Sequence, residues 1–272
     1  MLSFNSKKQL QQFLAEDIGK GDITSNLLPK KIITVKIISR ENAIVAGVRH
    51  AKEIFKIKEC NVKIMKKDGS KIKPNQTIMT ITGNAGKILT CERTALNILT
   101  RMSGIATQTN EMVKKIPKKT KLYATRKTAP GLRYFDKEAV EIGGGNKHRL
   151  RLDEMVMIKD NHIAIADSLQ SLIKKAKIKY KKFEVEVESI SDAVLAAKQG
   201  ASIIMLDNFT PTQIKKAIQV LKNQKLRNKV LLEASGGINL KNVTTYGKTG
   251  VDIISVGSIT NSVKGIDMSL EI

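Results

Sequence analysis

The chain has little cysteine, few aromatic residues and no long apolar run. Its two cysteines, Cys60 and Cys91, do not stand in a spacing that ligates zinc, so we expect buried thiols rather than a metal centre or a disulfide framework. No apolar stretch approaches the roughly 18 residues of a membrane-spanning helix, and the first residues contain no run of signal-peptide length. These absences predict a cytoplasmic protein with reduced thiols and no membrane partner.

Acidic residues are also scarce. The sequence holds 48 lysines and arginines against 25 aspartates and glutamates, a formal net charge of +23. Such a balance raises the question of nucleic acid or an anionic membrane. The lysines are scattered along the whole chain, however, whereas a nucleic-acid footprint is clustered and interleaved with aromatic residues. We therefore expect a lysine-rich surface and no nucleic-acid partner.

The first part of the chain has the pattern of an α+β unit. Apolar residues from Leu10 to Ile18 follow helical spacing, and this helix ends at the glycine-rich segment 19–22. Strands are predicted at 32–39, 61–65 and 77–83, with a helix around 48–55 between the first two. A helix beginning near Leu89 and a second one from Ile105 to Ile116 lead onward. We place an N-terminal α+β domain in residues 1–112.

The remaining residues, 113–272, predict a β/α barrel domain with a C-terminal tail. After Pro117 short apolar strands alternate with amphipathic helical stretches, which is typical of parallel βαβ units. About six such strands fit, fewer than the eight of a complete barrel, so we expect an open, incomplete barrel. The fold class is therefore α/β. The strands end in polar residues, and in barrels such ends converge on the site of chemistry.

Cationic side chains are concentrated between Thr125 and His162, in the segments ATRKTAPGLR, GGGNKHRLRLDEMV and IKDNH. They are too closely interleaved with apolar residues to form an ordinary solvated surface. This clustering predicts a site for a ligand with several negative charges. The side chains concerned are Arg126, Lys127, Arg133, Lys147, His148, Arg149 and Lys159.

Carboxylates occupy one face of the strand FEVEVES. The period of two places Glu184, Glu186 and Glu188 together, opposite Phe183, Val185 and Val187. Three carboxylates at a barrel mouth repel one another, so they require nearby lysines or a divalent cation. Asp207, at the end of the next strand, favours the cation, while ion pairs to Lys127 or Lys159 are the alternative, and both can hold together.

Glycines follow the last two predicted strands, in SGG at 235–237 and VGS at 256–258. Backbone N–H groups that glycine leaves accessible at a helix start bind phosphate. Barrel enzymes commonly bind phosphate in the loops after their last two strands. Two such motifs in this position predict a phosphate site.

These motifs resemble quinolinate phosphoribosyltransferase, also called nicotinate-nucleotide pyrophosphorylase (carboxylating). The resemblance is carried in order, over nearly the whole chain, by DIGKGDIT, CERTALN, TRKTAPGLR, GGGNKHR, IKDNH, VEVES, LDN and SGGI. It implies an N-terminal α+β sandwich domain plus an open β/α barrel, assembled as a homodimer or a hexamer of dimers with shared active sites. It also implies decarboxylating phosphoribosyl transfer in NAD biosynthesis, with quinolinate and phosphoribosyl pyrophosphate as substrates.

The resemblance also assigns roles to residues. For quinolinate it implies Arg126, His148, Arg149 and Lys159, joined by Arg93 from a neighbouring subunit. For phosphoribosyl pyrophosphate and its Mg²⁺ it implies Glu186 and Asp207 as ligands of the metal or the ribose, with Lys127 facing the phosphates. Lys127, Glu186 and Asp207 are the expected catalytic residues. The expected contacts to the substrates further include Thr125, Ser235, Gly236, Gly237, Val256, Gly257 and Ser258.

One position departs from the familiar pattern, because Lys147 stands where family members commonly have Asn before the His-Arg pair, and we leave Lys147 out of the site. Three alternatives remain for the function. They are the related phosphoribosyltransferase of molybdenum-transport operons, a nicotinate phosphoribosyltransferase, and a basic nucleic-acid-binding protein on an enzyme fold. The retained TRKT, His-Arg and KDNH motifs favour quinolinate.

Overall fold

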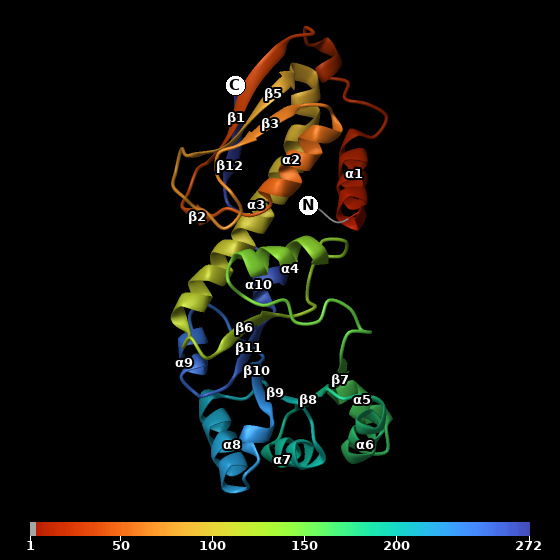
Figure 1. Ribbon diagram of the computed structural model, residues 1–272, viewed down its shortest axis with the longest axis vertical. Coiled ribbons are helices and arrows are strands. Elements are labelled where there is room, and N and C mark those ends of the chain that lie inside the picture. The colour runs from red at the N-terminus through yellow and green to blue at the C-terminus, as the bar shows by residue number, and fades with distance from the viewer. Residues whose placement is uncertain (1–3) are drawn as a thin grey trace. The chain divides into compact units, whose positions relative to one another are not determined.

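The computed structural model describes residues 4–272, which form two compact units (Figure 1). The first unit holds the residues up to Asn110 together with Pro130–Gly144 and Ser262–Ile272, and the second holds Glu111–Ala129 and Gly145–Asn261. The sequence suggested one boundary, between residues 112 and 113. The chain instead crosses between the units repeatedly, because two later segments pack with the first unit.

The first unit contains a four-stranded antiparallel sheet in the order β12-β1-β5-β3. Its strands β1 (Ile32–Ser39), β3 (Asn61–Ile64) and β5 (Thr77–Asn84) confirm the three predicted strands. The fourth strand, β12 (Met268–Glu271), was expected to be part of a C-terminal tail. It pairs with β1, so the end of the chain completes the sheet of its beginning.

Helices and short strands complete the first unit. Helix α1 ends at Ile18 as predicted, where Gly19 takes a positive φ of 55°. The remaining elements are α1 (Phe4–Ile18), the 3-10 helix η1 (Ser25–Leu27), the paired strands β2 (Ala43–Ile44) and β4 (Lys71–Ile72), α2 (Val48–Ile57) and α4 (Arg133–Ile142).

Helix α3 (Ala85–Lys115) is continuous, whereas the sequence suggested two helices with a break before Ile105. The glycine at that point, Gly104, serves a close approach and not a turn. A Cβ at Gly104 would lie 2.1 Å from the carbonyl oxygen of Lys264, so only glycine lets the two backbones meet. The prediction of a break was therefore wrong.

The second unit is a six-stranded parallel sheet in the order β6-β11-β10-β9-β8-β7 (Figure 1). Because β6 and β7 stand at opposite edges and do not pair, the expected open barrel is confirmed. Its strands are β6 (Lys121–Ala124), β7 (Val156–Ile158), β8 (Phe183–Val187), β9 (Ile203–Asp207), β10 (Leu231–Ser235) and β11 (Ile253–Val256). Its helices are α5 (Asp160–Ile165), α6 (Leu169–Lys179), α7 (Ile190–Gln199), α8 (Pro211–Asn223), η2 (Arg227–Lys229), α9 (Val243–Gly247) and α10 (Ser258–Asn261).

The strands of this sheet divide their residues between two faces. On β8 the side chains of Phe183, Val185 and Val187 are almost completely buried, as the period of two predicts for the face packed under helices. Glu184 on the other face is also fully buried, whereas Glu186 is only half-buried. The second face is therefore the polar interior of the barrel.

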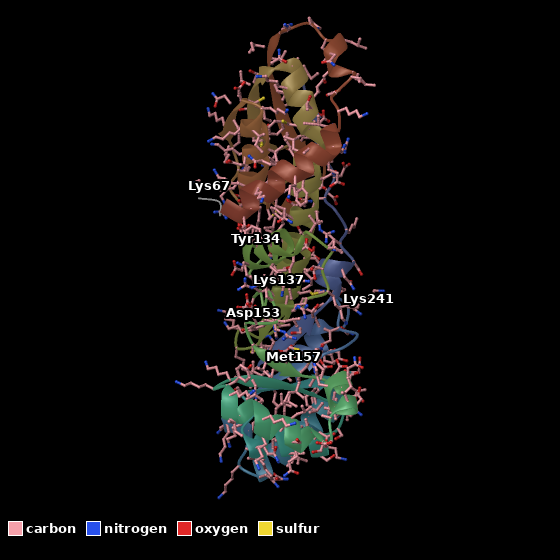
Figure 2. The ribbon with its side chains drawn as sticks, turned by 90° about the vertical axis from the view of Figure 1, so that its right-hand side faces the viewer. Lys67, Tyr134, Lys137, Asp153, Met157 and Lys241 are labelled. Atoms are coloured by element: carbon pink, nitrogen blue, oxygen red, sulfur yellow. The ribbon has the colours of Figure 1, made fainter. Side chains whose placement is uncertain are left out.

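Lysines lie mainly at the surface, as expected from the scattered pattern. Figure 2 labels Lys67 and Lys241, both exposed, and Lys137 of α4, which is fully buried. Among residues 4–272, none of the helices is both long enough and apolar enough to cross a membrane.

Candidate active site

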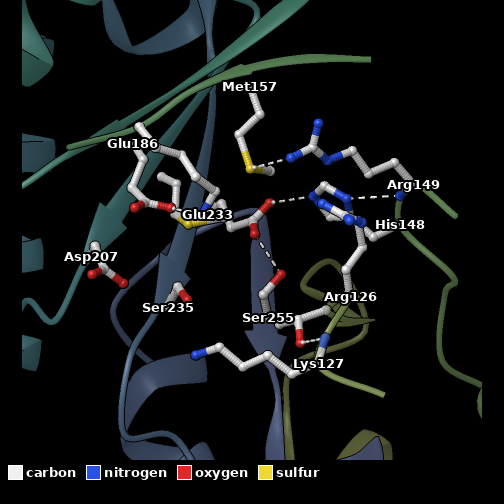
Figure 3. Close-up of a pocket in the computed structure, with 13 residues that line it drawn as sticks. Arg126, Lys127, His148, Arg149, Met157, Glu186, Asp207, Glu233, Ser235 and Ser255 are labelled. Atoms are coloured by element: carbon white, nitrogen blue, oxygen red, sulfur yellow. Dashed lines mark hydrogen bonds and ion pairs between the residues drawn. The ribbon is translucent and has the colours of Figure 1, made fainter. Parts of the chain in front are cut away.

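A cavity of about 320 Å³ lies at the carboxyl ends of the parallel strands (Figure 3). All of its lining residues belong to the second unit. They are Thr125, Arg126, Lys127, His148, Arg149, Met157, Lys159, Glu186, Met205, Asp207, Glu233, Ser235 and Ser255. The structure thus brings together most of the side chains that the sequence proposed for the site.

Four lining residues were given no role at the site from the sequence, although Glu233 was among the polar strand ends expected to converge: Met157, Met205, Glu233 and Ser255. Each stands two positions before a residue that was proposed, namely Lys159, Asp207, Ser235 and Gly257. Alternate residues of a strand point to the same side, so the period of two was the signal that could have identified them.

Two arginines, Arg126 and Arg149, share the positive charge of the cavity with two lysines. The Nε of Arg126 is buried and makes no hydrogen bond with the described residues. Arg149 donates from Nη1 to the Met155 carbonyl oxygen at 2.9 Å and from Nη2 to the Met157 sulfur at 3.3 Å. Burial and, next, the charge of Arg126 lower the pKa of the Arg149 guanidinium. Two crowded guanidinium groups and an unsatisfied donor favour an anionic ligand.

Lys127 enters the cavity from the loop after β6 (Figure 3). Its backbone N–H donates to Thr125 Oγ1 at 3.1 Å, and its carbonyl oxygen accepts from Thr260 Oγ1 at 2.8 Å. A Cβ on Gly257 would come within 3.0 Å of the Lys127 side chain. Gly257 does not line the cavity itself, so its absent side chain makes room for Lys127.

Two carboxylates, Glu186 and Asp207, line the cavity from the adjacent strands β8 and β9. Glu186 Oε2 accepts from Lys159 Nζ at 2.6 Å, which is one of the ion pairs that the sequence left open. Asp207 Oδ2 accepts from the Asn208 side chain at 2.8 Å. Neighbouring strands hold these acids within reach of a common ligand, and carboxylate oxygens suit Mg²⁺, so the pair fits the expected metal.

His148 has a strained backbone and an enclosed ring. Its φ is 52°, in the left-handed region that non-glycine residues rarely adopt. The backbone N–H of Arg149 donates to Nδ1 at 2.8 Å, while Nε2 lies 3.3 Å from Glu184 Oε2 and 3.6 Å from Glu233 Oε2. The Tyr123 ring packs edge-on at 5.6 Å between centroids. Both ring nitrogens are thus engaged within the protein.

The protonation of His148 follows from these contacts. Burial lowers its pKa, but the neighbouring carboxylates of Glu184 and Glu233 more than offset this and raise the pKa to about 9. A proton on Nδ1 would displace the Arg149 N–H, which opposes that rise. The tautomer with hydrogen on Nε2, facing the carboxylates, satisfies both nitrogens.

Glu233 and Ser255 line the cavity, and Glu184, which does not line it, lies beside them at the His148 ring. Both carboxylates are fully buried, and Ser255 Oγ donates to Glu233 Oε1 at 2.5 Å. Burial is the main cause that raises the pKa of Glu184. With His148 they could surround a metal on distance alone. The hydrogen on Nε2 argues against this, because a histidine ligand donates its other nitrogen to a neighbour, and here Nδ1 accepts.

The other residues proposed from the sequence lie outside the lining. Arg93 is exposed on α3 in the first unit, and Lys147 is half-buried and does not line the cavity. Gly236 and Gly237 follow the lining residue Ser235 with φ of 95° and 60°, so their backbone needs glycine. Val256 is buried, and Ser258, which begins α10, has a buried hydroxyl without a hydrogen-bond partner among residues 4–272.

Comparison with known proteins places this geometry in context. Residues 22–103 match the family described as quinolinate phosphoribosyl transferase, N-terminal domain, and residues 105–271 match its C-terminal domain. The chain is 46% identical over 255 residues to a probable nicotinate-nucleotide pyrophosphorylase [carboxylating] of Archaeoglobus fulgidus, covering 93% of this chain and 98% of the relative. A protein of the same description from Methanothermobacter thermautotrophicus is 42% identical, with 97% of each chain covered.

A solved structure agrees with these relatives. The nicotinate-nucleotide pyrophosphorylase from Francisella tularensis superposes with a TM-score of 0.92 at 39% identity, covering 100% of this chain and 97% of that one. The similarity therefore extends over both units of the fold.

Proposed function

This chain belongs to the quinolinate phosphoribosyl transferase family, and on that basis we propose that it makes nicotinate mononucleotide for NAD biosynthesis. It joins quinolinate to phosphoribosyl pyrophosphate and releases pyrophosphate and carbon dioxide. The observation that carries this proposal is the buried, unpartnered Nε of Arg126 beside Arg149 in a cavity whose other wall holds Glu186 and Asp207. One cavity thereby suits a dicarboxylate and a phosphorylated sugar.

Quinolinate occupies the cationic side of the cavity in this proposal. Planar guanidinium groups bind carboxylates through two parallel hydrogen bonds, so Arg126 and Arg149 are suited to its two carboxylates. Lys159 lies between this side and Glu186. His148 lines the same region. The Met157 and Met205 side chains offer apolar contact to the pyridine ring.

Phosphoribosyl pyrophosphate occupies the other side. Glu186 and Asp207 would hold Mg²⁺ or the ribose hydroxyls, with Lys127 on the phosphates. The metal, when bound, neutralises negative charge on the departing pyrophosphate. Thr125, Ser235 and the positive-φ backbone at Gly236 and Gly237 are available to the remaining phosphate oxygens. The loop 256–258, where Gly257 makes room for Lys127, completes this side.

The chemistry follows from the charges. Departure of pyrophosphate leaves positive charge on the ribose, which the carboxylates of Glu186 and Asp207 stabilise. The pyridine nitrogen then bonds to the ribose carbon. Loss of the adjacent carboxylate as carbon dioxide leaves an electron pair on carbon beside a cationic nitrogen, so that step requires no base. A proton from water then bonds to this carbon and completes nicotinate mononucleotide. Lys127, Glu186 and Asp207 are the proposed catalytic residues.

The family evidence bears on the alternatives. The matched relatives are described as nicotinate-nucleotide pyrophosphorylases, which favours this activity over the molybdenum-operon relative and over nucleic-acid binding. Two carboxylate-binding arginines in one cavity favour a dicarboxylate over nicotinate. We place the reaction in the cytoplasm, where the free thiols of Cys60 and Cys91 remain reduced.

A direct assay tests the proposal. Purified protein with Mg²⁺, quinolinate and phosphoribosyl pyrophosphate is expected to form nicotinate mononucleotide, with nicotinate in place of quinolinate as the control. Product from nicotinate alone would contradict the proposal. Equal inactivity with both substrates would contradict it as well.

We further propose a homodimer, or a hexamer of dimers, with active sites shared between subunits. Arg93 is exposed on α3 in the first unit and does not line the cavity of its own chain. In the oligomer it would supply positive charge to the substrate bound by a neighbouring subunit. Mixing Arg93→Ala with Lys127→Ala protein after mild dissociation should then restore part of the activity. If mass measurement confirms subunit exchange and the mixture stays inactive, Arg93 does not act across subunits.

A further inference from the structure

A cluster of buried polar groups at the cavity has no role in the chemistry above. Glu233 and Ser255 are buried and line the cavity with His148 and Arg149 (Figure 3), and the buried Glu184 lies close to His148. Buried carboxylates are costly unless their contacts serve the fold or the ligand. Their contacts converge on one ring nitrogen, Nε2 of His148.

That ring is the link between the buried cluster and the substrate arginine. His148 Nδ1 accepts the backbone N–H of Arg149, and the His148 backbone has a φ of 52°. A strained conformation of this kind persists only where the surroundings determine it from several sides. Here the surroundings are the carboxylates at Nε2, the Tyr123 ring edge and the Arg149 N–H.

We propose that Glu233, supported by Ser255, is a positioning residue that acts on substrate binding through His148 and Arg149. Its carboxylate oxygen faces Nε2–H at 3.6 Å, an ion-pair contact rather than a hydrogen bond. This attraction keeps the ring where Nδ1 fixes the strained His148–Arg149 backbone, and this backbone aims the guanidinium at the substrate carboxylate. His148 therefore acts through Arg149 and does not itself donate a hydrogen bond to quinolinate. The inference rests on the proposed function for the identity of the ligand.

Glu233 is the better residue to test. Glu184 lies nearer to Nε2, but it stands two positions from Glu186, so its replacement would also disturb the proposed metal site. Glu233→Gln keeps the shape and an acceptor oxygen for Nε2–H, whereas Glu233→Ala removes both. The matched control is Asp252→Ala, because Asp252 pairs with Arg227 at the amino end of β11, away from the cavity lining.

Calorimetry of quinolinate binding, with urea unfolding of each variant, separates positioning from stability. Glu233→Ala is expected to weaken quinolinate affinity about tenfold, because the acceptor oxygen that faces Nε2–H is lost, and to leave the KM for phosphoribosyl pyrophosphate unchanged. Glu233→Gln should remain within about threefold of wild type on the same reasoning. Asp252→Ala should lose stability with wild-type quinolinate affinity.

A double-mutant cycle tests the route through Arg149. In the Arg149→Lys background, Glu233→Ala is expected to have little further effect on quinolinate affinity, because the group that it positions is already gone. Fully additive effects would overturn the proposal. Wild-type affinity in Glu233→Ala, accompanied by reduced stability, would overturn it too.

Two further outcomes remain decisive. If Glu233→Ala does not fold, Ser255→Ala carries the test, with an expected affinity loss of about threefold and an unchanged affinity as the contrary result. Wild-type protein that binds quinolinate but forms no nicotinate mononucleotide would contradict the proposed function while leaving the positioning test intact.

Discussion

The two units treat buried charge differently. In the first unit Arg101 donates from Nε and Nη2 to the two oxygens of the fully buried Asp136, at 2.8 and 2.9 Å. In the second unit the buried Arg126 Nε and both oxygens of Glu184 make no hydrogen bonds with the described residues. Native proteins rarely leave buried polar atoms unsatisfied, and charged groups left so around a cavity are candidates for contact with a ligand.

Buried charges in the two units therefore contribute to different properties of the protein, stability in the first unit and activity in the second. A matched ion pair such as Arg101–Asp136 stabilises the fold of the first unit, so its removal should lower the free energy of unfolding. The buried charged groups of the cavity that lack a matched partner reduce the stability of the protein without substrate. Their removal should therefore reduce activity rather than stability. The four predictions below test this division, from the largest expected effect to the smallest.

Arg101→Ala should destabilise the protein by about 3 kcal/mol, because it leaves the buried Asp136 carboxylate without its bidentate partner. Urea unfolding monitored by circular dichroism measures the change. Arg49→Ala is the matched control, since the Arg49 side chain is 51% exposed and its ion pairs are worth less than about 1 kcal/mol. Equal losses of unfolding free energy in Arg101→Ala and Arg49→Ala would contradict this role for the Arg101–Asp136 pair.

Arg126→Ala and Arg149→Ala should each abolish useful turnover, because a substrate carboxylate is desolvated without its partner. The fall in kcat/KM should correspond to a loss of more than ~2 kcal/mol of transition-state stabilisation. Their unfolding free energies should stay near that of the wild type, since the two guanidinium groups repel each other. Initial rates and urea unfolding measure both. Arg151→Ala, at an exposed arginine of the same segment, should keep its activity. A variant of Arg126 or Arg149 with near-wild-type activity would remove that residue from the site.

Glu186→Gln should retain quinolinate affinity while kcat falls by roughly tenfold or more, because the lost carboxylate stabilises the ribosyl cation or its metal. Calorimetry and saturation kinetics separate the two effects. Glu188→Gln is the control, because Glu188 is exposed and does not line the cavity. Loss of quinolinate binding with normal turnover at saturation would contradict this role for Glu186.

The cysteines of the first unit should react slowly. Burial raises the pKa of the Cys91 thiol to about 12 and also raises that of Cys60, so neither forms the reactive thiolate at neutral pH. An aromatic disulfide reagent should modify the native protein slowly and reveal two thiols per chain after denaturation. A thiol that reacts fast in the native state would show that this part of the unit opens.

Local patterns were sufficient for much of the fold. The period of two in residues 183–187 predicted which face of β8 packs under helices, and the rhythm of short strands and helices predicted the open barrel. Pairing between distant segments left no local signal, however. Lys36 of β1 pairs with Glu271 of β12, so the last strand of the first sheet could not be recognised from its neighbours in sequence.

The sequence by itself determined most of the charged residues that line the cavity, because strand ends and a cationic cluster have local patterns. Only the tertiary structure decided how they are used. It showed that Gly104 meets a backbone rather than ending a helix, that Lys159 pairs with Glu186, and that both nitrogens of His148 are engaged. The physical reason is that these outcomes depend on distances between groups on different elements, and side-chain spacing along one element cannot specify such distances.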